Sequence, residues 1–188
     1  MKIVGLVGTQ VGWSTKTAMN NIKSILERKY EGEQVDIIDL ADYEVVFSDG
    51  RHYLDYTGDT KKVVRTLMDA DVIIITTPVF QASIPGTLKN IFDLLPMDAF
   101  ENKTVGIMVI AGSSKHYLVA EQQLKPILSF MKAQLVQTYV FAEQKDIVKG
   151  EIMNQDVLLR IDGLVDQIMQ TNAAFKQIKE LQEQMYDF

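Results

Sequence analysis

Short apolar runs rich in valine and isoleucine alternate with longer amphipathic segments along this 188-residue chain. Runs this short, with β-branched residues and little polar alternation, are typical of strands that are covered on both faces. Asp71 to Pro78 is the clearest case. Its proline marks the end of the strand, because proline cannot continue a central ladder. The predicted strands are Ile3–Val7, Val35–Leu40, Val72–Thr76, Val105–Ala111 and Leu135–Phe141.

The segments between these runs carry apolar residues at helical spacing. The predicted helices are Thr15–Lys29, Asp59–Met68, Pro85–Leu95, Leu118–Met131 and about Gln155–Met185. Tyr43–Thr57 is the least regular segment, and we interpret it as a long loop with room for a short helical turn.

Strand–helix alternation throughout a chain predicts an α/β fold, with a parallel sheet and helices on both faces. Five such units fit a doubly wound five-stranded sheet of order 2-1-3-4-5. The length suits one domain over residues 1–188, in which the last residues, about 171–188, form a helical extension.

The composition excludes several functional classes. The absence of cysteine excludes disulfides, iron–sulfur clusters and catalytic thiols, and with only two histidines we predict no metal site. A net charge of −6 disfavours nucleic acid and anionic membranes as partners. No apolar run approaches the ~20 residues that span a bilayer, and the N-terminus lacks the features of a secretory signal. We therefore expect a soluble, cytoplasmic protein.

In a sheet of this kind ligands bind beyond the carboxyl ends of the strands, so the loops after strands one, three and four are the candidate site. The first loop, Gly8–Thr17, combines hydroxyls with the free N–H groups of a helix N-terminus, which favours an anion. Its glycines do not have the Rossmann spacing, and Thr15 stands where a P-loop needs glycine before Lys16. A hydroxyl-lined site for a phosphate monoester remains; the alternative is an ordinary helix start with Ser14 as N-cap.

The other two loops offer groups for a planar ring. Thr77–Asp93 places an aromatic, an amide and a serine between a strand and a helix, although it can also be a turn with a core phenylalanine. In Ala111–His116, Gly112 permits close approach of a ligand to the backbone. His116 is the most site-like titratable group, but a lone histidine is more often a capping or hydrogen-bonding residue.

The second loop carries a specific resemblance. Pro78–Asn90 resembles the P-x-Y-N-x-S-x-P-G-x-L-K-N signature of the NAD(P)H-dependent FMN reductase family, with Phe80 for tyrosine and Gln81 for asparagine. The first loop resembles that family's G-S-x-R-x-x-S-x-N pattern, with Val11 for arginine and Lys16 for asparagine. The resemblance covers most of residues 1–170 and extends to the FMN-dependent azoreductases.

Gly112–Pro126 is similar to the sulfonate-utilisation FMN reductases. Those enzymes carry a tyrosine inserted in the following helix, which is associated with loose flavin binding. Gln122 stands at that place, which favours a flavin that stays bound.

The resemblance implies a flavodoxin-like fold, FMN and NADPH (or NADH) as cofactors, and a homodimer or homotetramer packed through helices beside the flavin. It also implies hydride transfer from the nicotinamide to FMN. Electrons would then pass to a small-molecule acceptor such as a quinone or azo compound. Alternatively, the reduced flavin itself would pass to a partner monooxygenase. The implied phosphate ligands are Thr9, Val11, Ser14, Lys16 and Thr17; the implied ring contacts are Pro78, Val79, Phe80, Gln81, Ala82 and Ser83 on one side, and Ala111, Gly112, Ser113, Ser114 and His116 on the other.

The cofactor supplies the redox chemistry in such a scheme, so we predict no catalytic side chain. Two rival hypotheses stay open. One is a flavodoxin-like electron carrier without enzymatic activity. Flavodoxins have a T-x-T-G-x-T loop, and Thr9–Ser14 of this chain partly matches it. The other is a flavin-binding regulatory or scaffold protein. Direct oxidation of NADPH would distinguish a reductase from both.

Overall fold

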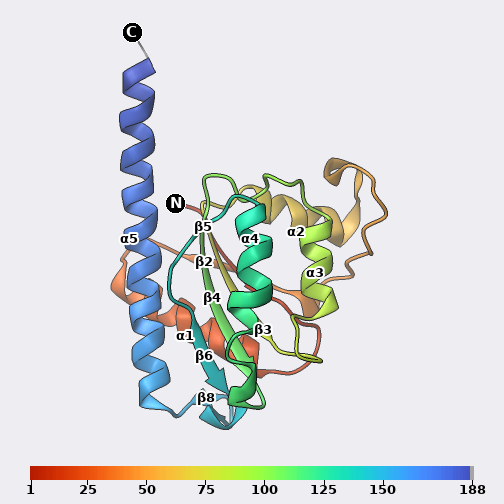
Figure 1. Ribbon diagram of the computed structural model, residues 1–188, viewed down its shortest axis with the longest axis vertical. Coiled ribbons are helices and arrows are strands. Elements are labelled where there is room, and N and C mark those ends of the chain that lie inside the picture. Colours follow the sequence, from red (N-terminus) through yellow and green to blue (C-terminus); the bar gives the residue numbers. More distant parts are fainter. Residues whose placement is uncertain (187–188) are drawn as a thin grey trace.

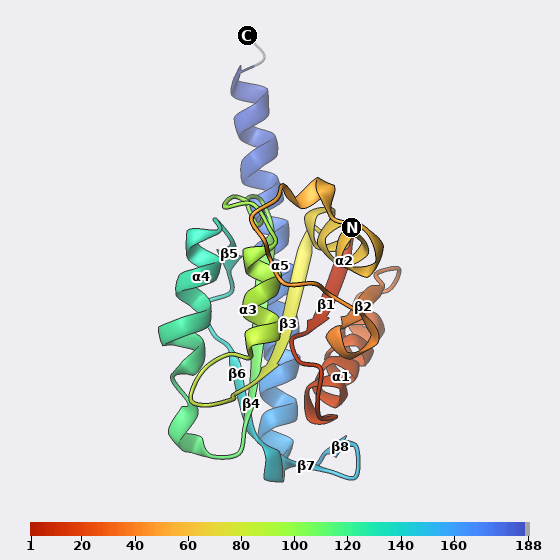
Figure 2. The ribbon, with the colours of Figure 1, turned by 90° about the vertical axis from the view of Figure 1, so that its right-hand side faces the viewer.

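The computed structural model describes residues 1–186, with side chains through Met185. A parallel sheet forms its centre (Figure 1), with the strands in the order β2-β1-β3-β4-β5 (Figure 2). The doubly wound, flavodoxin-like fold predicted from the sequence is thereby confirmed. The four long strands are β1 (Ile3–Val7), β2 (Val35–Asp39), β3 (Val72–Pro78) and β4 (Thr104–Ala111).

The predicted fifth strand is divided into β5 (Gln134–Leu135) and β6 (Val140–Glu143), which both pair with β4. The pairing offset changes from 30 residues at Thr104 with Gln134 to 32 residues at Met108 with Val140. Two extra residues must therefore leave the ladder between the pieces, so the sheet has six strands rather than five.

Helices cover both faces of the sheet (Figure 2). The helices α1 (Ser14–Lys29) and α5 (Gln155–Tyr186) pack on one face, and α2 (Gly58–Met68), α3 (Gly86–Asp93) and α4 (Lys125–Phe130) pack on the other. The isoleucines of β3 explain why both faces need cover, because Ile73 and Ile75 belong to one buried cluster and Ile74 to the other. None of the helices within residues 1–186 combines the length and apolar character required to cross a membrane.

The helix predicted over Leu118–Met131 is not regular. A π-helical segment, Ala120–Leu124, precedes α4 and contains Gln122. Pro126 lies at the start of α4, where it has no N–H to donate to the carbonyl of Gln122 and its ring would crowd that carbonyl. A wider π-helical turn before the proline relieves this conflict.

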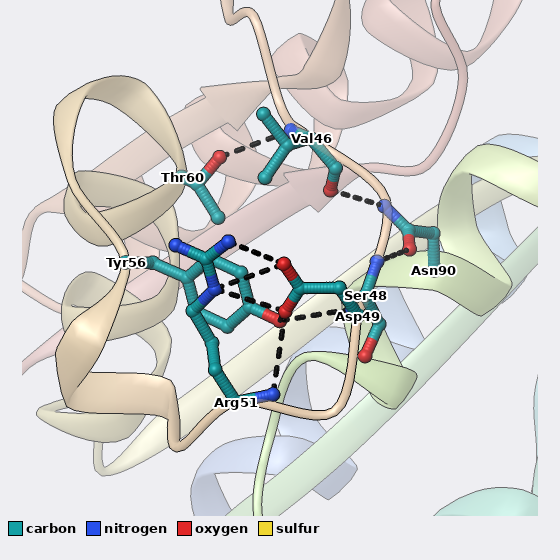
Figure 3. Close-up of polar contacts among 7 residues, drawn as sticks. All are labelled: Val46, Ser48, Asp49, Arg51, Tyr56, Thr60 and Asn90. Carbon is teal, nitrogen blue, oxygen red and sulfur yellow. Dashed lines mark hydrogen bonds and ion pairs between the residues drawn. The ribbon is translucent and has the colours of Figure 1, made fainter.

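The loop after β2 is held firmly although it lacks regular structure (Figure 3). The buried amide of Asn90 in α3 donates to Val46 O at 2.9 Å and accepts from Ser48 N at 2.9 Å. Further along, Asp49 is paired with Arg51 and accepts from the hydroxyl of the buried Tyr56 at 3.1 Å. The Arg51 guanidinium, by hydrogen bonding, holds the pKa of the Asp49 carboxyl well below its usual range. A short 3-10 turn, Tyr53–Asp55, completes the loop, in agreement with the sequence interpretation.

Short elements that the sequence analysis did not predict complete the carboxyl edge. They are the 3-10 turns Leu40–Asp42, Ser114–His116 and Gln144–Asp146, and the hairpin of β7 (Ile147–Val148) and β8 (Glu151–Ile152). The last helix, α5, ends at Tyr186, one residue beyond the predicted end; Asp187 and Phe188 of the predicted extension lie outside the described residues.

Candidate functional site

The three predicted loops meet at one pocket at the carboxyl edge of the sheet. The pocket has a volume of about 230 Å³. Three other depressions in the described residues are larger, at about 760, 570 and 500 Å³, but they do not lie at the switch point of the sheet. The pocket is lined by Val11, Gly12, Ser14, Thr15, Pro78, Val79, Phe80, Ile110, Ala111, Gly112 and Gln144.

The N-terminus of α1 forms one wall of the pocket. Its N-cap is Trp13, whose side chain makes no capping bond, so the alternative with Ser14 as N-cap is wrong. The first helical hydrogen bond runs from Thr17 N to Trp13 O at 2.9 Å. The N–H groups of Ser14, Thr15 and Lys16 therefore have no acceptor within the helix, and such groups bind anions.

Thr15, which was not among the phosphate ligands implied by the resemblance, provides the most informative hydroxyl. Its side chain is 2% exposed, yet Thr15 Oγ1 has no hydrogen-bond partner in the described part of the chain. A buried hydroxyl without a partner costs about 1–3 kcal/mol, so a pocket ligand that accepts its proton would recover that energy. By contrast, the hydroxyl of Thr9 is already used inside the loop, where it bonds to Val11 O at 3.1 Å and Val11 N at 3.2 Å.

The side chain of Lys16 points away from the pocket. Its ammonium lies 2.8 Å from Asp39 Oδ2 at the end of β2 and 3.7 Å from Asp42 Oδ2. The hydrogen bond to Asp39, with the charges of both carboxylates, raises the pKa of Lys16. Thr17 does not line the pocket either, and its carbonyl accepts from Asn21 Nδ2 at 2.9 Å. The helix start thus offers main-chain donors rather than the lysine charge.

The loop after β3 ends in a tight turn at the rim. Phe80 and Ser83 exchange two backbone hydrogen bonds of 2.9 and 3.0 Å, and Phe80, 42% exposed, faces the pocket. Gln81 and Ala82 between them have φ values of 50° and 59°, which cost roughly 1–2 kcal/mol per residue for side chains other than glycine.

The strained turn is clamped from outside the loop. Gln123 in the π-helical segment donates to Ala82 O at 3.1 Å, and its amide oxygen accepts from Ser83 Oγ. No sequence motif identified Gln123, because a single glutamine on a helix carries no local signal for a contact about 40 residues away.

The loop after β4 supplies the opposite wall through Ala111 and Gly112, and a Cβ added at Gly112 would meet nothing within 4 Å. Ser113 accepts a hydrogen bond from Lys115 N at 3.3 Å and begins a 3-10 turn. The pocket lining does not include Ser113, Ser114 or His116. Gln144, which follows β6, does so and was not predicted.

This pocket, at the switch point of a flavodoxin-like sheet, defines the chain as a protein of the flavodoxin-like class. The sequence profile of the NADPH-dependent FMN reductase family matches residues 1–146. The chain belongs to that family, which confirms the resemblance described above. It is an NAD(P)H-dependent FMN reductase with FMN and NAD(P)H as its cofactors.

Individual proteins agree with this assignment. The chain is 39% identical over 179 residues to the NAD(P)H-dependent FAD/FMN reductase of Geobacillus thermodenitrificans, covering 94% of this chain and 96% of that protein. It is also similar to a solved NADH:FMN oxidoreductase in its apo form, with a TM-score of 0.73, 23% identity, and 92% and 89% of the two chains covered. Flavodoxin 1 from Bacillus cereus shares the fold at a TM-score of 0.64 and 16% identity, with 90% and 98% covered.

Proposed function

We propose that the pocket holds FMN with its phosphate at the N-terminus of α1, and that this protein uses NADPH or NADH to reduce it. The observation that carries this assignment is the unpartnered hydroxyl of Thr15, a residue that lines the same pocket as the helix N-terminus. A phosphate monoester supplies acceptor oxygens for both kinds of donor. Ser14, Thr15 and the main chain of Val11 to Lys16 would hold it, while Thr9 shapes the loop.

The remaining walls fit a flat ring. Pro78, Val79 and Phe80 form an apolar side, and Gly112 leaves room for close approach on the other. When bound, FMN supplies the hydride-accepting and electron-donating chemistry. The main chain from Gln81 to Ser83, held by Gln123, would position the ring edge, and Ser113, Ser114 and His116 would border its far side. We propose no side-chain acid or base.

We further propose a small acceptor such as a quinone or azo compound, or delivery of reduced flavin to a partner monooxygenase. Gln122, within the π-helical segment, supports a flavin that stays bound. A cytoplasmic location fits the use of reduced nicotinamide dinucleotides. We also propose that residues 1–188 form one domain, because both buried clusters share one sheet.

A homodimer packed through α3 and α4 fits an apolar groove between these helices. The groove has a volume of about 500 Å³ and includes Phe92, Leu95 and Ile127, with Met97 72% and Phe130 69% exposed at its rim. A mass of one 21.3 kDa chain in sedimentation equilibrium would reject this assembly.

The function is tested by recording the visible spectrum and following NADPH and NADH oxidation with and without FMN. We expect oxidation that depends on FMN, followed by transfer to a quinone or azo dye. A carrier would bind FMN but need a separate reductase for turnover, and a regulatory protein would bind it without turnover under any condition. Full activity of protein free of flavin would contradict the proposal.

The Thr15→Val substitution tests the phosphate site. Because valine has the same shape and no hydroxyl, the flavin-free protein should gain about 1 kcal/mol in free energy of unfolding, while FMN binds ~10-fold more weakly. Urea unfolding and fluorescence titration measure the two effects. The matched control is Thr104→Val: its hydroxyl is also buried without a partner in residues 1–186, but at the opposite edge of the sheet. There we expect a stability gain alone; equal affinity losses in both variants would remove Thr15 from the site.

A further inference from the structure

The C-terminal part of α5 projects beyond the body of the protein (Figures 1 and 2). Asn172 is the last buried residue of the helix, and residues 173–186, which we call the arm, extend about 21 Å further at 1.5 Å per residue. Three large apolar side chains of the arm are exposed: Ile178 by 52%, Leu181 by 61% and Met185 by 76%.

These three residues form a stripe that does not continue the core-facing side of α5. At about 100° per residue, they lie within about 60° of one another, together with Ala174. The buried residues of α5, such as Ile161, Ile168 and Asn172, lie about 120° further around the helix. The stripe therefore faces sideways, and its own domain cannot cover it.

The stripe is in line with a groove at the edge of the sheet. Arg160, Gly163 and Gln167 of α5 lie on the same side of the helix as the stripe, and they line one wall of the depression of about 760 Å³. Tyr117 and Tyr139 are part of the opposite wall. A glycine inside a helix costs about 1 kcal/mol relative to alanine, and a Cβ at Gly163 would meet nothing within 4 Å. The position is open space beside a helix, as close packing of another helix requires.

We propose that α5 pairs antiparallel with α5 of a second copy of this chain, so that each arm lies along the edge groove of the other copy. The spacing of the two halves of the helix supports a single register. Along the arm, the stripe residues are spaced by 4, 3 and 4 positions: Ala174, Ile178, Leu181 and Met185. Read toward the N-terminus, the first half of the helix has residues on the same side at the same spacing: Gln167, Gly163, Arg160 and Asp156. In this register Ile178 of each copy fills the space at Gly163 of the other.

Charge and area agree with self-association. The residues that flank the stripe are Gln177, Gln182 and Gln184, whereas Lys176, Lys179, Glu180 and Glu183 lie on the other side of the helix. The groove that the arm would meet contains Glu121, Lys125 and Arg160, and no charged residue of the arm lies on the stripe side to repel them. Two helices about 48 Å long and 10 Å wide would bury on the order of 1,000 Å², near the lower limit for a specific interface, before the groove walls are counted.

Paired cysteines test the register, because the native chain has none. The double variant Gly163→Cys with Ile178→Cys should form a covalent dimer on mild oxidation, seen on a non-reducing gel. The two positions are about 22 Å apart within one helix, too far for an internal disulfide. The matched control, Gly163→Cys with Lys179→Cys, turns one thiol about 100° away and should stay monomeric on the gel. Failure of the first pair to cross-link, equal linking of both pairs, or efficient linking of Ile178→Cys alone would overturn the register.

Solution mass tests the interface itself. Ile178→Asp with Leu181→Asp should halve the mass by sedimentation equilibrium and raise the dissociation constant by at least about 100-fold. Both side chains are exposed in one copy, so the separated copies should stay folded and keep the circular dichroism spectrum of the wild-type chain. Lys179→Asp is the matched control and should keep the original mass. An unchanged mass in the double variant, or a wild-type chain of 21.3 kDa that instead sediments with phosphatidylcholine vesicles, would overturn the proposal. None of these readouts depends on flavin, so they are independent of the proposed flavin chemistry. A homodimer packed only through α3 and α4 would keep its mass in the double variant, which separates the two interfaces.

Discussion

An aspartate in place of Ser14 is expected to weaken FMN binding by at least about 100-fold while leaving the folded protein as stable as before or slightly more stable. The first turn of α1 has no acidic residue. A carboxylate there interacts favourably with the helix dipole, by about 0.3–1 kcal/mol. The same carboxylate occupies the anion site and repels a phosphate, so the loss of charge-assisted bonds of about 1.5–3 kcal/mol each sets the size of the effect.

Fluorescence titration and thermal unfolding of Ser14→Asp measure these opposite effects. The matched control is Thr57→Asp at the start of α2, whose N-cap also lacks a side-chain bond and does not line the pocket. That variant should gain similar stability and bind FMN normally. Unchanged affinity in Ser14→Asp would show that the phosphate is bound elsewhere.

Asn90→Ala is expected to lower the free energy of unfolding by about 2–4 kcal/mol. Asn90 is 8% exposed, and its amide serves both Val46 O and Ser48 N (Figure 3). Alanine leaves two main-chain groups of the loop without these partners, at about 1–3 kcal/mol for each group that stays buried. Urea unfolding measures the total, and hydrogen exchange at Ser48 N reports the loop itself.

Two further variants separate the clamp from general effects on α3. Lys89→Ala removes an exposed ion pair with Asp93 and should cost no more than about 0.5 kcal/mol. Asn90→Asp keeps an acceptor for Ser48 N, but it cannot donate to Val46 O and it places a charge in a buried site. We therefore expect it to lower the free energy of unfolding at least as much as Asn90→Ala. A loss below about 0.5 kcal/mol in Asn90→Ala would show that the loop is held by other contacts.

Much of the fold could be predicted because its signals are local. The run Val72–Thr76 is apolar at every position but its end, and only a strand covered on both faces buries all of it. The alternation of strand and helix predicted a parallel sheet, and five such units fit the order 2-1-3-4-5. The family assignment came from Pro78–Asn90, where the spacing of prolines, glycine and polar residues is itself the signal.

The candidate site was predicted less completely. Its three loops were identified, since the carboxyl ends of parallel strands share one edge. Whether a given side chain enters the pocket depends on competing partners, and these come from elsewhere in the chain. Lys16 is drawn to Asp39, and the turn after Phe80 depends on Gln123.

The amino-acid order by itself thus determined the long strands, the main helices and the family, because periodicity and motif spacing depend on neighbours along the chain. Only the tertiary structure decided that Thr15 rather than Lys16 faces the pocket, that the fifth strand divides into two, and that one side of α5 is left uncovered. Each of these depends on hydrogen bonds and packing contacts between residues that are far apart in the sequence. The spacing of residues along the chain does not indicate which of these contacts form.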